Sequence, residues 1–526
     1  MPLHPRTTWA RDKLPVFLLC IVLALCAPLH GLASNRNSRT TPRPTALPQP
    51  TRDPNAETYD AGMPERLTPD MLVASAAILI EVQSGEVIFE KNADDILYPA
   101  STTKIMTALL TIQSMVYDDL LVKANVSAYA GNPPANSSRV PVTEGEEVRM
   151  IDLLYGMMLR SGNDAATALA EHIAGTEAAF AQRMNETAAF LGCQNTHFVN
   201  AHGYHDPNHY STARDLAIIA RTAMRLILPE ESLLPNEDEN GEERPRTPTF
   251  REVSETMEYV MPATNIHPKR RLLTHNDMIN TTKENNRNYF ADAIGIKTGF
   301  HSEAMYCFVG AAERDGVELI SVVLHSSERE RWTDTRRLME YGFAQYTSVT
   351  LEQIYRASPR EINISGFDLS DAQHRGRLEL GIRPMDASRQ VTIVGREETI
   401  AAIERDFAQL TQVRITRPDR APVTAGEVMG YLTYFPENDV PVEYELYATR
   451  SIEARKDAPL TLEEIKLMTE TDPNPLPPFS LEFLVVPFSF LLMLFLLFKL
   501  FRRRRVRRRS RKQQKRLPTP KTRSFR

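Results

Sequence analysis

The chain is poor in cysteine and tryptophan, with four and two of these residues among 526. Cys20 and Cys26 lie in an apolar N-terminal run, so Cys193 and Cys307 are the two left for the body of the chain. One possible pair in a body of this size excludes a small scaffold held by disulfides. Buried free thiols are the simpler interpretation, and a single bridge stays open.

Internal repeats are absent, and so are acidic residues at the C-terminus. From Lys499 to Arg526 there are fifteen Lys and Arg and no Asp or Glu, although the formal net charge of the chain is −5. The body is therefore acidic and the tail is basic. A basic tail can bind nucleic acid, but directly after an apolar run membrane topology and contact with anionic lipid explain it better. No nucleic-acid partner is expected.

Two apolar runs predict export and anchoring. Residues 1–33 combine a basic start, an apolar stretch and a small-residue cleavage context, which predicts a signal peptide, with an uncleaved membrane helix as the alternative. Residues 481–501 carry charges only near their ends and are long enough to cross a bilayer. The arginines that follow predict a cytoplasmic tail, so the body is expected outside the cytoplasm at the cell membrane.

The pattern between the two runs predicts a region of strands and helices followed by a smaller β-rich region. A hairpin is predicted from Ala77 to Phe89, where a turn separates two apolar runs. Helical periodicity predicts helices at 103–115, 150–160, 163–173, 177–191, 213–226 and 332–346. Strands are predicted at 291–297, 306–311, 319–324, 391–394 and 428–432.

Composition places the boundaries between these regions. A Pro- and Thr-rich stretch lacks apolar periodicity and predicts a disordered linker, and an acidic, Pro-rich segment predicts a solvated insertion. The expected divisions are a signal peptide (1–33), a linker (34–68), a catalytic domain (69–347) with an acidic insertion (229–250), a β-rich domain (348–455), a linker (456–480), a transmembrane helix (481–501) and a basic tail (502–526).

Ser101 and Lys104 form the first segment that carries chemistry. The motif Ser101-Thr102-Thr103-Lys104 follows Pro99 at a predicted helix start, and three-residue spacing puts both side chains on one face. A hydroxyl becomes a good nucleophile when a neighbouring base takes its proton, and a lysine of lowered pKa can do so. The motif alone is short enough to occur by chance.

Two further segments complete the set. Ser161-Gly162-Asn163 follows a predicted helix; its hydroxyl and amide suit a proton relay and a substrate grip, while a helix cap is the simpler alternative. Lys297-Thr298-Gly299 ends an apolar strand, where the lysine and threonine suit carboxylate binding and the glycine allows close backbone approach. An ordinary strand end is the alternative for this motif.

In this order the three motifs resemble the penicillin-recognising serine peptidases and β-lactamases. The surrounding sequence resembles, more narrowly, the D-alanyl-D-alanine carboxypeptidase family, the low-molecular-mass penicillin-binding proteins. The resemblance covers roughly 76–346, with a weaker one at 421–431 to that family's C-terminal β-domain. The matching segments are 77–80, 91–93, 100–110, 195–200 and 295–300.

The resemblance implies an α+β fold, with an antiparallel sheet flanked by helices, then a small β-rich domain. It implies that Ser101 attacks the carbonyl between two terminal D-alanines of a peptidoglycan stem peptide and that Lys104 accepts its proton. Ser161 and Asn163 complete the proton network and grip the peptide. Lys297 and Thr298 bind the terminal carboxylate or tune the nucleophile, and Gly299 lets the substrate backbone come close. Backbone N–H groups of Ser101 and Phe300 form the oxyanion hole. β-Lactam antibiotics should acylate the same serine, and no cofactor is implied.

Two positions depart from the family pattern. His301 stands where threonine is usual, and Met305 where glycine is usual. Four residues of the loop 201–210, namely His202, His205, Asp206 and His209, suggest zinc, but the loop matches a non-metal family, so no metal is expected.

Three other functions stay open. A same-fold β-lactamase of class A needs a Glu-x-x-Leu-Asn motif, and none follows Asn163. A peptidoglycan endopeptidase shares the expected site. A non-catalytic cell-wall-binding scaffold would keep the fold, and the intact motifs argue against it.

Overall fold

The computed structural model describes two compact units. The described residues are 64–115, 123–229, 236–237, 243–244, 246–368, 371, 373–385, 390–436 and 440–456. The first unit takes its described residues from Met1–Ile354 and Gln390–Leu410, and the second from Tyr355–Arg389 and Thr411–Arg526.

The predicted membrane signals lie outside the described residues. These are the signal peptide 1–33, the span 481–501 and the tail 502–526, together with most of the two predicted linkers. Within the part of the chain that the structure describes, no helix has the length and apolarity that a bilayer crossing requires.

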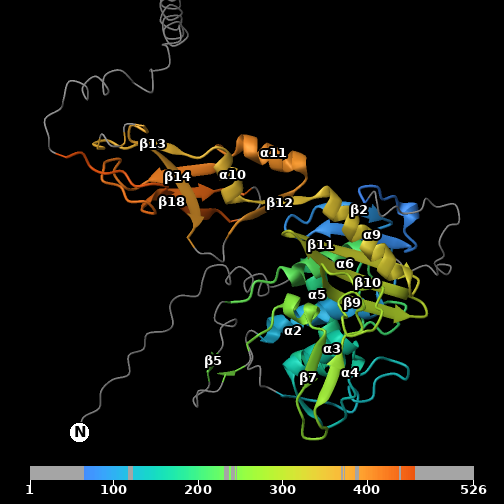
Figure 1. Cartoon of the computed structure of the whole chain (residues 1–526). Helices are drawn as coiled ribbons and strands as arrows, with labels where there is room; N and C mark the ends of the chain where they lie inside the picture. The colour runs from blue at the N-terminus through green and yellow to red at the C-terminus, as the bar shows by residue number, and fades with distance from the viewer. Residues whose placement is uncertain are drawn as a thin grey trace, which may run out of the picture. The chain divides into compact units, whose positions relative to one another are not determined.

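A five-stranded antiparallel sheet forms the framework of the first unit (Figure 1). Its strand order is β2-β1-β11-β10-β9, so the N-terminal hairpin pairs with three consecutive strands from much later in the chain. The predicted hairpin and the three predicted strands of this region are confirmed. The strands are β1 (Ala76–Glu81), β2 (Val87–Lys91), β9 (Ala293–His301), β10 (Met305–Arg314) and β11 (Val317–Ser326).

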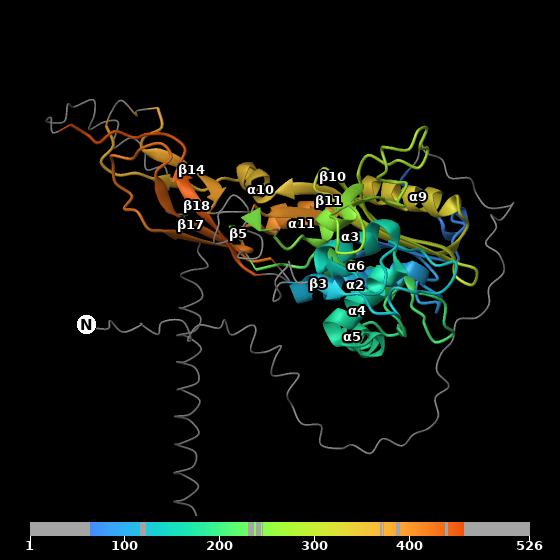
Figure 2. The same ribbon diagram turned by 90° about the horizontal axis from the view of Figure 1, so that it is seen from below.

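Helices cover both faces of this sheet, as the α+β expectation requires. Ile78 and Val322 belong to a core shared with most of the helices, whereas Leu79 and Val323 pack with residues of α9. Alternate side chains of a strand point to opposite faces, so β1 and β11 are buried on both sides. Figure 2 shows α9 on one side of β10 and β11, with α6, α2, α4 and α5 on the other.

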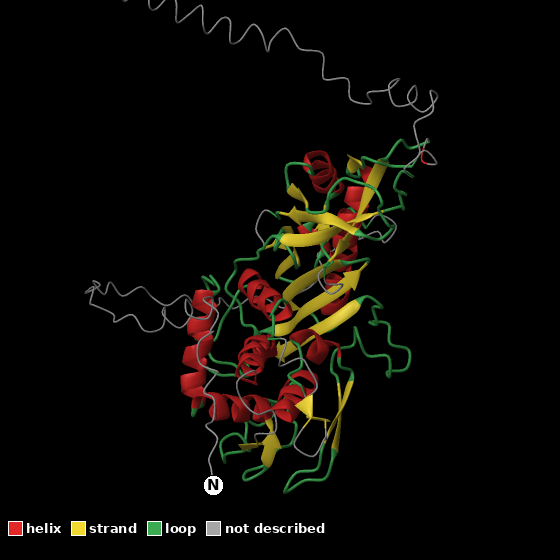
Figure 3. Ribbon diagram, turned by 90° about the vertical axis from the view of Figure 1, so that its left-hand side faces the viewer, coloured by secondary structure: helices red, strands yellow, loops and turns green. Residues whose placement is uncertain are grey.

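The predicted helices are present with small changes at their ends. A short 3-10 turn, η2, precedes α2, where the sequence predicts a helix from residue 103. Figure 3 shows the helices in red beside the yellow strands. The helices are η1 (Pro69–Met71), η2 (Ala100–Thr103), α2 (Lys104–Met115), α3 (Met150–Arg160), α4 (Asn163–Ala174), α5 (Glu177–Phe190), α6 (Ala213–Met224), α8 (Phe250–Glu255), α9 (Glu330–Gln345), α10 (Leu351–Ala357) and α11 (Glu397–Asp406).

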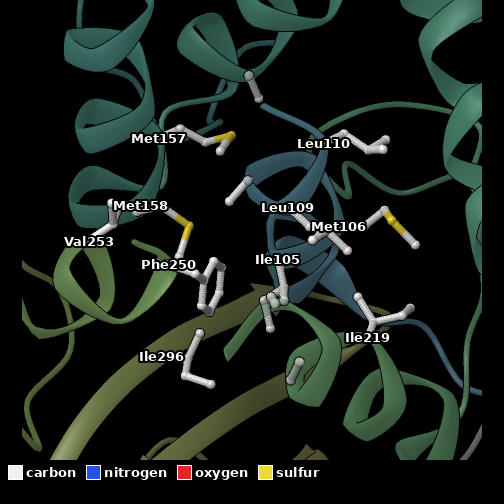
Figure 4. Packing of buried hydrophobic residues seen from close by; sticks show 14 of the residues in the cluster. Ile105, Met106, Leu109, Leu110, Met157, Met158, Ile219, Phe250, Val253 and Ile296 are labelled. Carbon is white, nitrogen blue, oxygen red and sulfur yellow. The ribbon is translucent and has the colours of Figure 1, made fainter. Parts of the chain in front are cut away.

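Helix α2 lies at the centre of the larger core. Figure 4 shows Ile105, Met106, Leu109 and Leu110 of α2 surrounded by residues of α3, α6, α8 and β9. Ten of the twelve α2 residues are buried, and they include the polar residues Lys104, Thr107 and Thr111 as well as the apolar ones, so the core encloses the helix on all sides. This packing holds the start of α2, and therefore Ser101 and Lys104, against the sheet.

The first unit also contains short two-stranded sheets, and the second unit is built around a second five-stranded sheet. The pairs are β3 (Lys123–Asn125) with β4 (Glu147–Arg149), β5 (Asn236–Glu237) with β6 (Glu243–Arg244), β7 (Glu258–Met261) with β8 (Arg270–Leu273), and β12 (Thr347–Thr350) with β15 (Thr392–Gly395). The second sheet has the order β13 (Glu361–Asn363), β14 (Arg377–Pro384), β18 (Val442–Ala448), β17 (Val428–Tyr434) and β16 (Thr411–Ile415).

The unit boundary differs from the single cut expected after residue 347. Residues 348–354 and 390–410 belong to the first unit because β12 and β15 pair with each other there. The predicted strands at 391–394 and 428–432 are present as β15 and β17, but they belong to different units.

Both cysteines of the described residues are free. Cys307 is fully buried and Cys193 is partly exposed. Burial raises the pKa of the Cys193 thiol to about 12 and that of the Cys307 thiol to about 11. The open alternative of a bridge between them is therefore wrong.

Replacing Leu109 with alanine should lower the free energy of unfolding by about 2–5 kcal/mol, because a fully buried side chain would leave a cavity. Ile227→Ala is the matched control, because this side chain is 91% exposed and its loss should change the free energy by less than about 0.5 kcal/mol. Urea denaturation of the variants measures both values. Equal effects of the two substitutions would contradict the central position of α2.

Candidate functional site

Ser101 lies in the η2 turn, directly before α2. The turn is tight: Ala100 has a positive φ of 48°, which is uncommon for a residue with a side chain. The Thr102 hydroxyl donates to the Pro99 carbonyl at 2.7 Å and thereby fixes the turn. Ser101 remains partly exposed, while Lys104, one turn later, is fully buried. The Lys104 Nζ lies 3.0 Å from the Ser101 Oγ.

The Lys104 amine is enclosed by two further oxygen atoms. Its Nζ donates to the Asn163 Oδ1 at 2.7 Å and to the backbone carbonyl of His202, also at 2.7 Å. Burial lowers the pKa of Lys104 well below its ordinary value, and the positive charge of Lys297 lowers it further. The carboxylates of Asp164 and Glu177 oppose this shift. The site therefore favours a neutral amine.

Asn163 reaches Lys104 because it begins α4. Ser161 occupies the left-handed position that ends α3, with φ of 58°, and Gly162 precedes α4 as its N-cap. The Asn163 N–H donates to the Ser138 carbonyl at 2.8 Å, which fixes the start of the helix. Among the described residues, Ser161 is buried but its hydroxyl makes no hydrogen bond to Ser101 or Lys104.

Asp164 fixes the neighbouring loop to the same helix start. Its carboxylate accepts hydrogen bonds from the N–H groups of Val140 at 3.0 Å, Val142 at 3.2 Å and Ala165 at 2.9 Å. Burial raises its pKa, and these three donors act in the opposite direction. The carboxylate thus joins a loop to the first turn of α4 and holds Asn163 in place.

The third motif lies on β9, the edge strand of the sheet. A Cβ added at Gly299 would lie 2.9 Å from the Pro99 carbonyl oxygen and 3.2 Å from the Ser101 nitrogen. The strand therefore packs directly against the turn that carries Ser101, and glycine is what allows this approach. The structure brings the first motif, Asn163 and the third motif together.

Lys297 is buried on the same face of β9 as Gly299. Its Nζ donates to the Thr298 carbonyl at 3.0 Å. Burial lowers the pKa of Lys297 to about 7, and the nearby Arg331 contributes in the same direction. Thr298 and Phe300 point to the other face of the strand, where Phe300 is 54% exposed and its ring lies 4.3 Å from that of Tyr306.

Several groups of this site were missed by sequence reasoning. The His202 carbonyl is a backbone acceptor, which carries no signature in the side-chain sequence. A Cβ added at Gly203 would overlap the Ala100 carbonyl oxygen, and Gly203 has φ of 79°, so the glycine that follows His202 is the signal in the sequence for this contact. Arg331 stands among many charged residues of α9, and its buried Nε has no hydrogen-bond partner within the described residues.

The suggested zinc residues of the loop 201–210 have separate contacts. The Tyr204 N–H donates to the His202 Nδ1 at 3.0 Å, so the proton of the neutral His202 ring is on Nε2. This Nε2 lies 3.3 Å from the Glu177 Oε1 and faces it. Asp206 accepts the Asn208 N–H through its side chain at 2.7 Å. Burial lowers the pKa of His202 well below its ordinary value.

His209 supports the turn that carries Ser101. The Val199 N–H donates to its Nδ1 at 3.2 Å, so its Nε2–H faces the Thr103 hydroxyl at 2.8 Å. That hydroxyl in turn donates to the Ala100 carbonyl at 2.8 Å. Burial lowers the pKa of His209 to about 3, which keeps this donor chain in one direction at neutral pH.

Comparison with known proteins supports the geometry. Residues 63–328 match the family model described as D-alanyl-D-alanine carboxypeptidase, and this stretch is about half of the chain. The chain belongs to the D-alanyl-D-alanine carboxypeptidase family. The three motifs and the sheet of the first unit all lie within the stretch that matches.

Curated relatives of this carboxypeptidase family extend beyond the matched stretch. The D-alanyl-D-alanine carboxypeptidase DacF of Bacillus subtilis is 31% identical over 274 residues, which are 52% of this chain and 63% of the relative. DacC of Escherichia coli is 34% identical over 284 residues, or 53% of this chain and 63% of the relative. The match thus spans less than two thirds of both. A Streptomyces carboxypeptidase is 34% identical and is covered to 94%.

Solved structures of similar proteins include two from bacteria. The Streptomyces K15 DD-transpeptidase has 31% identity and a TM-score of 0.44, with 52% of this chain and 98% of that chain covered. Penicillin binding protein 5 from Haemophilus influenzae has 24% identity and a TM-score of 0.46, with 74% of this chain and 100% of that chain covered.

Gly203→Ala should destabilise the protein more than Gly175→Ala, although both glycines have nearly the same positive φ, 79° and 78°. Alanine is strained at a positive φ in both variants, so this strain should lower the free energy of unfolding of each variant by about 1 kcal/mol. Only Gly203 faces the Ala100 carbonyl, whereas nothing lies within 4 Å of a Cβ at Gly175. Urea denaturation measures the difference. Equal losses would show that the loop does not press on the Ser101 turn.

Proposed function

We propose that the chain is a serine-type D-Ala-D-Ala carboxypeptidase that removes the terminal D-alanine from peptidoglycan pentapeptides. The observation that carries the proposal is the set of three atoms around the Lys104 amine. Two of them, the Asn163 Oδ1 and the His202 carbonyl, only accept hydrogen bonds. A neutral amine has two N–H groups for these acceptors and one lone pair, which is left for the Ser101 hydroxyl at 3.0 Å.

This arrangement makes Lys104 the general base for Ser101. The hydroxyl gives its proton to the Lys104 lone pair while its oxygen attacks the carbonyl carbon of the last peptide bond. The C–N bond then breaks, and the leaving D-alanine takes at its amine the proton that Lys104 accepted from Ser101, which restores the neutral Lys104. A water molecule afterwards hydrolyses the ester on Ser101 and releases the shortened peptide. Asn163 holds the Lys104 amine in place, and Lys297 and Thr298 are assigned to the substrate.

The open edge of β9 suits the peptide end of the substrate. An extended peptide can pair with an edge strand by main-chain hydrogen bonds, which is a common mode of recognition. Lys297 on that strand and the nearby Arg331 of α9 provide positive charge for a terminal carboxylate, and the backbone of Thr298 and Gly299 lies along the same edge. The N–H groups of Ser101 and Phe300 are assigned to the oxyanion hole. Each such donor typically lowers the activation barrier by about 3–4 kcal/mol.

Penicillins are proposed as ligands of the same site. Relatives named D-alanyl-D-alanine carboxypeptidase and a similar structure named as a penicillin binding protein support this. The β-lactam carbonyl would acylate Ser101 in place of the peptide carbonyl. Ser161, which is buried at the end of α3, is assigned to the proton network by the resemblance of its motif to that of the family.

The catalytic unit is proposed to work outside the cytoplasm, anchored by one C-terminal helix. The support is in the sequence: an N-terminal signal pattern at 1–33, an apolar run at 481–501 and the basic tail 502–526 that follows it. This location would bring the site to the cell wall, where stem peptides occur. No nucleic-acid partner and no cofactor take part in the proposal.

Ser101→Ala should abolish release of D-alanine from a pentapeptide, because within the described residues the Ser101 hydroxyl is the one that hydrogen-bonds to the Lys104 amine. The same variant should lose the penicillin adduct, which mass spectrometry should locate on the peptide containing Ser101. Ser451→Ala, at an exposed serine of the second unit, should leave both unchanged. D-Alanine release by the Ser101 variant at the wild-type rate would exclude the assignment, and rapid loss of the adduct would favour a β-lactamase.

The rate of acylation should follow the lowered pKa of Lys104. Below that pKa the amine carries a proton and cannot accept another, so the rate falls as the pH is lowered. Above it the rate should level off, at a pH well below the ordinary lysine value of 10.5. Single-turnover labelling with a saturating fluorescent penicillin across this pH range measures the profile. A rate still rising in proportion to hydroxide near pH 10.5 would contradict a neutral Lys104.

Capture of the ligand should show the opposite pH dependence. Lys297 loses its positive charge as the pH rises through its pKa of about 7, so attraction for the ligand carboxylate weakens. The dissociation constant of the first complex, measured by repeating the labelling over a range of penicillin concentrations, should therefore increase above that pH. Lys297→Met should remove this dependence and move the Lys104 limb of the acylation rate to higher pH, because the Lys297 charge no longer lowers the pKa of Lys104.

A further inference from the structure

Three metal-ligand side chains from two distant segments meet beside the Ser101 turn. His205 belongs to the loop that follows Gly203, while His301 ends β9 and Glu303 lies in the β9–β10 turn. One ligand atom from each lies within 4.8 Å of the other two. The sequence places His205 in a suggested zinc cluster with His202, Asp206 and His209, but in the structure these three side chains contact other groups. Its partners in the fold are about a hundred residues further along the chain.

One nitrogen of His205 lacks a hydrogen-bond partner. Its Nδ1 is buried and unpaired within the described residues. A buried polar atom without a hydrogen-bond partner lowers the stability of a protein by roughly 1–3 kcal/mol. A cation bound at this nitrogen would remove that cost. Aromatic rings hold the imidazole in place, with the Tyr98 ring 4.8 Å and the His301 ring 5.1 Å away.

His301 has two competing neighbours at one nitrogen. The Ala304 N–H donates to the His301 Nδ1 at 3.1 Å, which uses its lone pair. The Glu303 Oε2 also lies 3.1 Å from this atom, although a carboxylate can only accept. Two electron-rich atoms therefore face each other. The Ser302 hydroxyl donates to the same Oε2 at 2.6 Å, and a cation nearby would offset the remaining repulsion between the carboxylate and the lone pair of Nδ1.

The chemistry of the three ligands selects the class of cation. Two imidazoles and one carboxylate are typical of zinc and similar transition metals, which often use three protein ligands and one open position. Calcium and magnesium prefer oxygen ligands and fit this set poorly.

We propose that His205, His301 and Glu303 form a binding site for a zinc-class divalent cation. The two segments that supply the ligands both press on the turn before Ser101: Gly203 lies against the Ala100 carbonyl, and Gly299 lies against the Pro99 carbonyl. The bound cation joins these two segments across the turn. It thereby stabilises the walls of the site without taking part in the proton transfer to Lys104.

Metal titration of the full chain tests this site. The purified chain is stripped with a chelator and titrated with Zn²⁺ by calorimetry, and with Co²⁺ by the visible absorption of the bound ion. One equivalent should bind and raise the unfolding temperature. His205→Ala and His301→Ala should each weaken binding by at least about tenfold. His172→Ala, at an exposed histidine of α4, is the matched control and should bind as the native chain does.

Two further variants keep the test decisive. Glu303→Gln changes a residue that is 45% exposed and keeps its size, so it should fold even if the histidine variants do not, and it should also weaken binding. Ser101→Ala should bind the metal normally, which separates this proposal from the proposed peptidase activity. Native protein that binds no Zn²⁺, or variants that bind it equally, would show that His301 and Glu303 form a plain ion pair and would overturn the site.

Discussion

An amine without solvent is the constraint on which the site depends. Lys104 is fully buried, and an ammonium ion in such a place loses several kcal/mol of hydration. Burial therefore favours the neutral form of Lys104, and each N–H of this neutral amine has an oxygen acceptor. Both acceptors come from other parts of the chain, one from α4 and one from a loop after α5. The general-base role that we propose for this amine therefore requires three separate segments to meet at one nitrogen.

Close backbone approach brings those segments together. Gly203 and Gly299 each lie where a side chain would meet the turn of residues 99–101. The turn is thus held between a loop and an edge strand, with the buried helix α2 behind it. Asp164 adds a third support through its three backbone donors at the start of α4. The nucleophile is positioned by packing and hydrogen bonds to main chain rather than by its own side-chain contacts.

The sequence predicts side-chain motifs better than the backbone that surrounds them. Helix α3 ends where its pattern ends, because Arg160 is followed by serine and glycine. Ser101, Lys104 and Lys297 were found because they belong to short motifs that follow one another in an order that is rare by chance, although the first motif alone is not rare. The His202 carbonyl was not, since a backbone acceptor depends on the path of a loop. The grouping of His205 with His301 also escaped prediction, because it requires the register of β9 and the position of a loop that lies distant in the sequence.

The edge position of β9 has a consequence for solubility. An unpaired strand edge is a template on which other chains can add, and natural proteins often protect such edges with an inward-pointing charge. Lys297 lies on this strand and is buried toward the body of the unit. The residue that we propose to bind the peptide end therefore also makes the edge unfavourable for a second copy of the strand. One buried charge would bear on both recognition of a ligand and self-association.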